Sequence, residues 1–401
     1  MAPATTEVPI TWETTLNTAA ALSRTSEAGV AAAEAADAVG VALRDADADA
    51  SCELVVVFVS REHHEHLAGI AAAIEARLEP GVLLGAVAQG VIGPDEEVES
   101  GPAVSVWGAS RLDGSLQPFR AWTLRPSGGG LAVAGWPDSG PDDITLVLAD
   151  PASFPASEVL ERIGEQRPGH VVIGGLMTGG PGRAGFLLDD RVHEDGAVGV
   201  VITGAAIGAV VSQGCRPVGE PLTVTGAVRD RVLELGGEPA TNRLQELLEQ
   251  VDDADRALLR GGGLHLGVVV QDARDHYRTG DFLVRGVLGV EPASGALTVG
   301  DAIEVGRTVQ FHVRDAASAS AELQSRLATV DGLAGGLLFS CTGRGARLFG
   351  EPDHDVTAVG AHVRGAVAGA FCAAEIGPVG SRSYVHAFTA SLAAFGHPVR
   401  A

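Results

Sequence analysis

The run LVVVFVS, residues 54–60, is the segment from which the fold can be worked out. Its almost unbroken apolar character predicts a strand that is buried on both faces, as in a sheet covered by helices. Residues 62–78 then place apolar side chains at helical spacing, and Pro80 ends this predicted helix. Two further strands are expected, at residues 82–88 and 103–110, so the order is strand, helix, strand, strand.

The same order returns twice along the chain. From residue 144 a strand, a helix and two strands follow each other, and LGAVAQG (84–90) aligns with IGGLMTG (173–179) with both glycines five residues apart. A third copy is expected from LLFSCTG (337–343), through a helix at 356–367, to the apolar run at 384–395. The sequence therefore predicts an α/β (mixed α+β) fold of duplicated strand-helix-strand-strand units, with sheets covered by helices.

Two other segments have patterns of their own. Residues 11–44 are rich in Ala, with apolar residues at helical spacing, and are expected to form a helix. After residue 217 the repeated order stops, and a helix at 244–251, three strands and a helix at 316–330 are expected instead. We therefore predict two domains, residues 1–217 and residues 218–401.

Composition excludes several function classes. The 401 residues carry a net charge of −23, and all 28 basic residues are Arg, since the sequence has no Lys. A P-loop and a Schiff base both need a Lys, so neither chemistry is expected. The acidic chain offers no basic patch for nucleic acid or for an anionic membrane surface. No cofactor is expected.

The cysteines and the chain ends give the expected location. Cys52, Cys215, Cys341 and Cys372 are far apart and form no CxxC, so neither a zinc ribbon nor a disulfide framework is predicted. No secretory signal is recognised, and the longest uncharged segment, residues 196–215, is interrupted by glycines as a membrane helix would not be. A cytoplasmic protein is expected.

Several runs resemble a known family. FVSREHH and LLGAVAQGVIG resemble the N-terminal half of the FIST family, and DFLVRGVLGVEP, LLFSCTGRG and EIGPVGSRSYVHAFTASL resemble its C-terminal half. The resemblance covers nearly the whole chain. It implies an intracellular sensory protein that binds a small ligand, with amino acids as the proposed class, and that acts in signal transduction. No kinase, cyclase, chemotaxis or F-box segment is recognised in the chain, so any output is expected to come from a separate signalling partner or not to exist.

Two loops are the candidate ligand site. CTGRG (341–345) follows a strand of buried type, and its glycines allow close backbone approach while Arg344 offers a fork for a carboxylate. In EIGPVGSR (375–382), Glu375 could accept an ammonium group, so the two loops together would suit a zwitterion such as an amino acid. The predicted ligand-binding residues are Cys341, Thr342, Gly343, Arg344, Gly345, Glu375, Gly377, Gly380, Ser381, Arg382 and His386.

Each candidate has a plainer explanation, and two other function classes stay open. The two loops could be ordinary turns. His386 could be a core histidine whose hydrogen bonds are made within the protein. A cysteine-dependent enzyme would use Cys341 as nucleophile with His386 as base and Glu375 orienting it. A scaffold without a ligand would instead show an exposed apolar patch. The run EHHEH (62–66) lacks the HExxH spacing, so no metal site is predicted. The oligomeric state stays open, a homodimer included.

Overall fold

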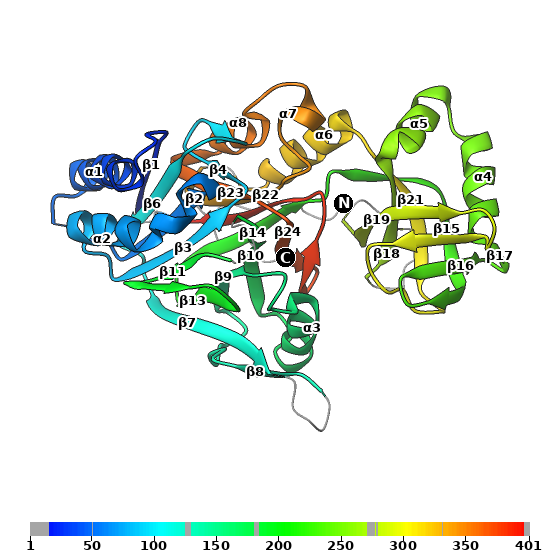
Figure 1. The fold of residues 1–401 in the computed structure, drawn as a ribbon, viewed down its shortest axis with the longest axis horizontal. Helices are drawn as coiled ribbons and strands as arrows, with labels where there is room; N and C mark the ends of the chain where they lie inside the picture. Colours follow the sequence, from blue (N-terminus) through cyan, green and yellow to red (C-terminus); the bar gives the residue numbers. More distant parts are fainter. Residues whose placement is uncertain are drawn as a thin grey trace, which may run out of the picture.

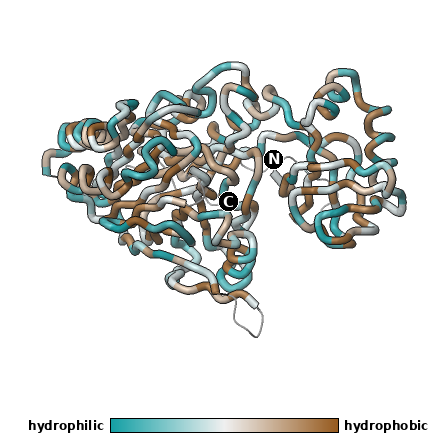
Figure 2. The backbone as a smooth tube through the Cα atoms, viewed as in Figure 1, coloured by the Kyte–Doolittle hydropathy of each residue, from teal (hydrophilic) through white to brown (hydrophobic). Residues whose placement is uncertain are grey.

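The structure is a computed structural model that describes residues 16–49, 51–124, 130–179, 184–270, 277, 280–330 and 332–396. Figure 1 shows two bodies side by side. The larger one, here called the three-unit body, contains three mixed sheets formed by residues 16–214 and 315–396, and the smaller one, the small barrel, is formed by residues 215–314. In Figure 2 the apolar stretches follow the inner strands of both bodies, while loops and outer helix faces are polar.

The three-unit body confirms the predicted repeat. In every unit the first two strands are parallel and joined by a helix, and the last strand is antiparallel to the first. Unit 1 consists of β2 (Leu54–Ser60), α2 (Leu67–Leu78), β3 (Val82–Ala88) and β6 (Val104–Ser110). Unit 2 consists of β9 (Ile144–Ala149), α3 (Ala156–Gln166), β10 (Val171–Leu176) and β13 (Ala197–Thr203). Unit 3 consists of β22 (Leu333–Cys341), α8 (His354–Gly360), β23 (Val363–Cys372) and β26 (Ala390–Phe395).

The units exchange strands in a closed cycle. After its second parallel strand, each unit sends a hairpin to the second parallel strand of another unit: unit 1 to β23, unit 2 to β3, and unit 3 to β10. These hairpins are β4 (Gly90–Ile92) with β5 (Glu97–Val98), β11 (Phe186–Leu188) with β12 (Arg191–His193), and β24 (Ala374–Val379) with β25 (Arg382–His386). Strands β1 (Asn17–Ser23), β7 (Ser115–Leu124) and β14 (Ile207–Ser212) pair with the last strands of units 1, 2 and 3. The body therefore has threefold pseudo-symmetry around one shared apolar core.

Helices cover the outer face of each sheet, as predicted. The apolar faces of α1 (Ala28–Ala46) and α2 pack on the first sheet, and that of α3 packs on the second. The third sheet is covered by α6 (Ala316–Leu327) and α8. The 3-10 turn η1 (Arg61–His66), which contains the EHHEH run, leads into α2, and the four-residue α7 (Ala346–Phe349) follows the 341–345 loop.

The small barrel closes on itself. Its strands lie in the order β15-β21-β18-β19-β20-β16, and a further pairing between β15 and β16 completes the ring around a separate apolar core. The strands are β15 (Cys215–Val228), β16 (Arg231–Leu235), β18 (Leu264–Val269), β19 (Phe282–Glu291), β20 (Ala296–Val299) and β21 (Thr308–Arg314). Strand β17 (Glu238–Pro239), α4 (Ala240–Gln250), α5 (Asp253–Leu258) and the π turn η2 (Leu259–Gly263) connect β16 to β18.

The structure differs from the sequence predictions in two places. Residues 17–23 form the edge strand β1 rather than the start of a helix, because they pair with β6; residues 11–15 lie outside the described part. The helix predicted at 356–367 ends at Gly360, where the chain turns into β23. Sheets also join segments from both sides of residue 217, since β24 pairs with β10 and β26 with β14. The division at residue 217 stays a prediction.

Candidate functional site

The loop 341–345 lies where the two bodies meet. The chain enters the small barrel at Cys215 and leaves it at Arg314, and these two residues are register partners, so both connections lie side by side. The loop follows the carboxyl end of β22, and the Nη2 of Arg314 donates a hydrogen bond to the carbonyl oxygen of Gly343. In Figure 1 this junction lies next to α6. A predicted ligand loop is therefore held against the two connections between the bodies.

Arg344 is fully buried and already has a carboxylate partner. Its Nε lies 2.6 Å from Oδ2 of Asp355 and its Nη2 2.9 Å from Oδ1, while Nη1 lies 3.5 Å from the carbonyl oxygen of Phe388. Ser340 also donates to Asp355, over 2.8 Å. Although burial opposes ionisation, the charge of Arg344 holds the pKa of Asp355 well below its usual range. The guanidinium fork that was expected to take a ligand carboxylate is therefore filled, and Arg344 fixes the loop.

Glu375 belongs to the same cluster but has few partners. Its side chain is fully buried, Oε2 accepts the backbone N–H of Thr389 over 3.1 Å, and Oε1 has no hydrogen-bond partner among the described residues. Burial raises the pKa of Glu375 well above its ordinary value, a shift that the nearby charge of Arg344 only partly opposes. Burial therefore favours the neutral form of this carboxyl group, because a buried carboxylate with so few hydrogen bonds is costly.

Arg314, at the end of β21, is the cation that the sequence analysis missed. It is half-buried, and after burial its pKa is affected most by the thiols of Cys215 and Cys341 and by two other guanidinium groups, those of Arg344 and Arg347. Its Nε has no hydrogen-bond partner in the described part of the chain. Burial lowers the pKa of Arg314, although an arginine stays charged at neutral pH. The junction therefore holds a positive charge that no carboxylate in the described part of the chain neutralises.

Phe388 completes this side of the junction in an unusual backbone conformation. It has φ of 64°, a left-handed value that is rare for a large side chain. Its ring lies 4.8 Å from the guanidinium carbon of Arg314, and the ring of His265 from the small barrel meets it edge-on with centroids 4.3 Å apart. Such strain persists only where the surrounding structure fixes it, and it often accompanies ligand sites.

The remaining predicted residues fall into two groups. Near the loop, the N–H of Thr342 donates to Cys372 O, Gly343 N–H points to the Sγ of Cys341 at 3.4 Å, and His386 Nε2 donates to Gly377 O over 2.9 Å. The structure does not bring the turn at Gly380, Ser381 and Arg382 to this place. That turn lies at the other end of the β24–β25 hairpin, four residues or about 13 Å from Glu375, where Arg382 packs beside α3.

A second buried acid supports the loop from outside the predicted site. Glu97 on β5 is 7 % exposed, and its Oε1 accepts the N–H of Val356 at the start of α8 over 2.8 Å. Its Oε2 has no partner among the described residues. Burial, and then the negative charge of Asp355, raise the pKa of Glu97 to about 7. The neighbouring Glu99 accepts the N–H of Ala346 over 2.7 Å. Unit 1 therefore braces the loop of unit 3.

The raised pKa of Glu97 gives a testable pH dependence. Because the folded state holds this proton more tightly than the unfolded state, Glu97 costs stability as the pH rises from about 4.5 to about 7, and the cost then stays constant. We expect Glu97→Gln, which keeps the acceptor for Val356, to raise the free energy of unfolding at pH 8 by up to about 3 kcal/mol. At pH 4 the gain should disappear. Urea unfolding at both pH values measures this, and an equal effect at both would contradict it.

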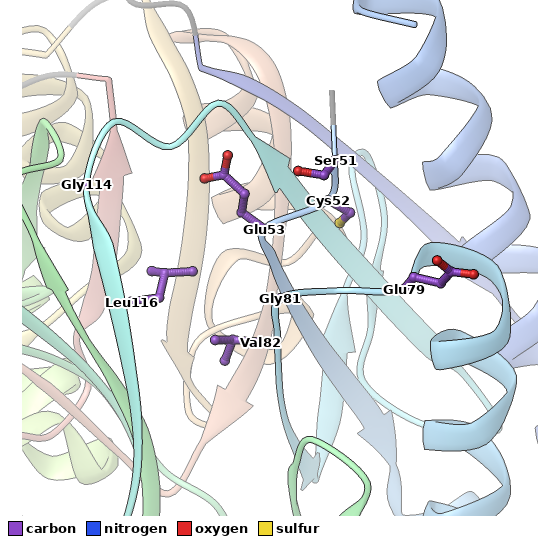
Figure 3. A pocket seen from close by; sticks show the side chains of 8 residues that line it. All are labelled: Ser51, Cys52, Glu53, Glu79, Gly81, Val82, Gly114 and Leu116. Carbon is purple, nitrogen blue, oxygen red and sulfur yellow. The ribbon is translucent and has the colours of Figure 1, made fainter. Parts of the chain in front are cut away.

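A separate cavity lies at the amino ends, rather than the carboxyl ends, of the unit 1 strands. It has a volume of about 390 Å³ and is lined by Ser51, Cys52, Glu53, Glu79, Gly81, Val82, Gly114 and Leu116 (Figure 3). Glu53 Oε2 accepts the N–H of Leu112 over 3.0 Å. This cavity is at the amino ends of β2 and β3, whereas ligands of open α/β sheets bind at the carboxyl ends. The junction is therefore the stronger candidate.

Comparisons with known proteins match most of the chain. The model of the FIST N domain matches residues 53–238, and that of the FIST C domain matches residues 240–378. The boundary between the two models falls inside the small barrel, at Pro239, the last residue of β17. Within the described residues, no helix is both long and apolar enough to cross a membrane.

Relatives are found among mycobacterial proteins. The chain is 42 % identical over 352 residues to the uncharacterized protein Rv0628c of Mycobacterium tuberculosis, a match that covers 85 % of this chain and 91 % of that protein. It is 39 % identical over 369 residues to the uncharacterized protein Mb0898c of Mycobacterium bovis, covering 90 % of this chain and 95 % of the relative.

Proposed function

Because the chain belongs to the FIST family, with both its N and its C domain, we propose that it is a sensory protein that binds a small carboxylate-bearing ligand at the junction between the three-unit body and the small barrel. FIST domains are associated with the sensing of small ligands in signal transduction. Amino acids, the class expected from the sequence, carry a carboxylate, and so do many other metabolites. A cytoplasmic location and a separate signalling partner are part of this proposal.

One observation carries the proposal. Arg314 is a half-buried cation without a carboxylate partner among the described residues, in a chain whose net charge is −23. Removing a cation from water without a counter-charge is costly. Acidic residues are abundant in this chain, so its composition does not explain why none of the described ones pairs with Arg314. An anionic ligand group would supply the missing charge, and guanidinium groups match carboxylates in geometry.

The position of this site at the connections between the two bodies explains how binding could produce a signal. A ligand that contacts Arg314 and the 341–345 loop would touch residues of both bodies, because Arg314 ends β21 of the small barrel and the loop follows β22 of the three-unit body. Binding would then favour one orientation of the small barrel, since a ligand shifts the equilibrium toward the arrangement it contacts best. A partner could detect that orientation.

Binding should depend on Arg314. In a thermal-shift screen of amino acids and simple organic acids, followed by calorimetric titration of the best ligand, Arg314→Gln should weaken binding about 10- to 100-fold, the range for a lost charge-assisted hydrogen bond. Arg382→Gln, at the exposed end of the β24–β25 hairpin, is the matched control and should bind normally. Equal affinity of Arg314→Gln and the unmodified protein, or the absence of any ligand in the screen, would contradict the proposal.

The cysteine-enzyme hypothesis makes a different prediction. Burial raises the pKa of Cys341 to about 12, so roughly one thiol in 100,000 would be ionised at pH 7. All four cysteines are buried. We expect the folded protein to react with a thiol reagent such as DTNB at least 100-fold more slowly than the urea-unfolded protein, followed by absorbance, because only the thiolate reacts. Fast labelling of Cys341 in the folded state would instead favour the enzyme.

A further inference from the structure

We propose that the ligand is an organic acid without an ammonium group, such as a 2-oxo or 2-hydroxy acid, because the junction presents a guanidinium, that of Arg314, with no carboxylate partner among the described residues, while its buried acids Asp355 and Glu322 already have arginine partners. This inference rests on the proposed function and narrows its ligand class. It follows from the partners of each charged side chain around the 341–345 loop.

Two acids in the buried part of the junction, Asp355 and Glu322, already have arginine partners. Both oxygens of Asp355 bond to Arg344, and they also bond to Ser340 and His354. Glu322 Oε2 accepts the backbone N–H groups of Gln213 and Gly214, over 2.8 and 3.1 Å, and Ser212 Oγ over 3.2 Å. Its Oε1 lies 3.8 Å from Arg326. Each of these two acids therefore has an arginine as its ionic partner, although Oε1 of Glu322 accepts no hydrogen bond among the described residues.

Glu375, which the sequence offered as the ammonium acceptor, is the wrong kind of group for that role. Its carboxyl is fully buried, makes one side-chain hydrogen bond to the N–H of Thr389, and leaves Oε1 without a partner among the described residues. The guanidinium nearest to it, that of Arg344, is committed to Asp355. A group in this setting is stable as the neutral acid, and a neutral acid does not compensate an ammonium.

The cations at the loop outnumber the acids that are free to pair with them. Arg314 has no carboxylate partner among the described residues, and Arg347 is exposed nearby. Glu99 is the exposed acid beside the loop, and its Oε1 is bonded to the N–H of Ala346. An amino acid held by Arg314 through its carboxylate would bring its ammonium to roughly 5 Å from that guanidinium, where repulsion is about 3 kcal/mol at an effective dielectric constant of 20. A 2-oxo or 2-hydroxy acid carries an oxygen at C2 in place of the ammonium group, so it avoids this repulsion.

The test uses matched ligands that differ only at C2. The full chain is titrated calorimetrically with sets of an L-amino acid, the 2-oxo acid and the 2-hydroxy acid of the same carbon skeleton, from three to six carbons. We expect the tightest oxo or hydroxy acid to bind at least tenfold more tightly than its amino acid. Glu375→Gln and Glu99→Gln should leave the affinity of that acid within twofold, with thermal melting as the check on folding.

The outcomes separate this inference from the proposed function. If an amino acid binds more tightly than its oxo and hydroxy counterparts, or if Glu375→Gln or Glu99→Gln abolishes amino-acid binding, the inference is wrong and carboxylate sensing stands. If no member of any set binds, the proposed function itself is wrong. Glu99→Gln keeps this distinction even if Glu375→Gln fails to fold, because Glu99 is exposed.

Discussion

Replacing Arg344 with methionine should lower the free energy of unfolding by about 3–5 kcal/mol. The substitution removes the guanidinium from a pair in which both side chains are at most 1 % exposed, and it leaves the Asp355 carboxylate buried without its counter-charge. The cost of that unpaired charge, rather than the lost attraction, dominates the effect. Urea unfolding at pH 7, followed by circular dichroism, gives the measurement.

A double variant separates the unpaired charge from the lost contacts. Arg344→Met combined with Asp355→Leu removes both charges and should recover much of the loss, because apolar pairs often replace buried ion pairs at little cost. The exposed pair of Arg24 and Glu96 is the control, and Arg24→Met should cost less than about 1 kcal/mol. A loss below about 1 kcal/mol for Arg344→Met would show that the pair does not anchor the loop.

Gly369→Ala should destabilise the three-unit body by about 3 kcal/mol or more, the range for forced overpacking. A Cβ at this position of β23 would lie 1.9 Å from the carbonyl oxygen of Leu338 on the neighbouring strand β22, far inside any allowed contact. Gly174 occupies the equivalent place in unit 2, where a Cβ would lie 1.8 Å from Val147 O. Glycine at this position therefore lets the two parallel strands of a unit approach each other.

The control for this prediction is a glycine with open space around it. A Cβ at Gly69 in α2 would meet no atom within 4 Å, so Gly69→Ala should be neutral or stabilise the protein by up to about 1 kcal/mol through helix propensity. Denaturant unfolding of both variants under the same conditions gives the comparison. Similar stabilities of Gly369→Ala and Gly69→Ala would contradict the close packing of β22 and β23.

The repeat could be predicted because each unit carries its own local signals. Buried strands such as LVVVFVS and ITLVLA are recognisable as apolar runs, and glycine recurs at residues 85, 174 and 369, where a Cβ would collide with the register partner on the neighbouring parallel strand. The exchange of hairpins could not be predicted, because strands as short as β4 and β11 have three residues each and their partners lie in another unit. The edge strand β1 was missed because its Ala-rich sequence has no period of its own.

The candidate site was predicted in part. The 341–345 loop and Glu375 were found from glycines and charged residues after apolar strands, and they do lie in one cluster. That Asp355 occupies the fork of Arg344 depends on how α8 packs against the end of β22, which no local pattern reveals. Arg314 gave no signal beyond ending a strand, since its importance depends on the absence of a carboxylate partner among the described residues.

Hydrogen–deuterium exchange with the tightest acid from the titrations tests the central claim, that the ligand bridges the two bodies at Arg314. The account predicts slower exchange in residues 341–346 and 386–390 and in the two connections at 212–216 and 313–316. Protection confined to residues 51–53, 79–82 and 114–116 around the separate cavity, with the junction unchanged, would contradict it.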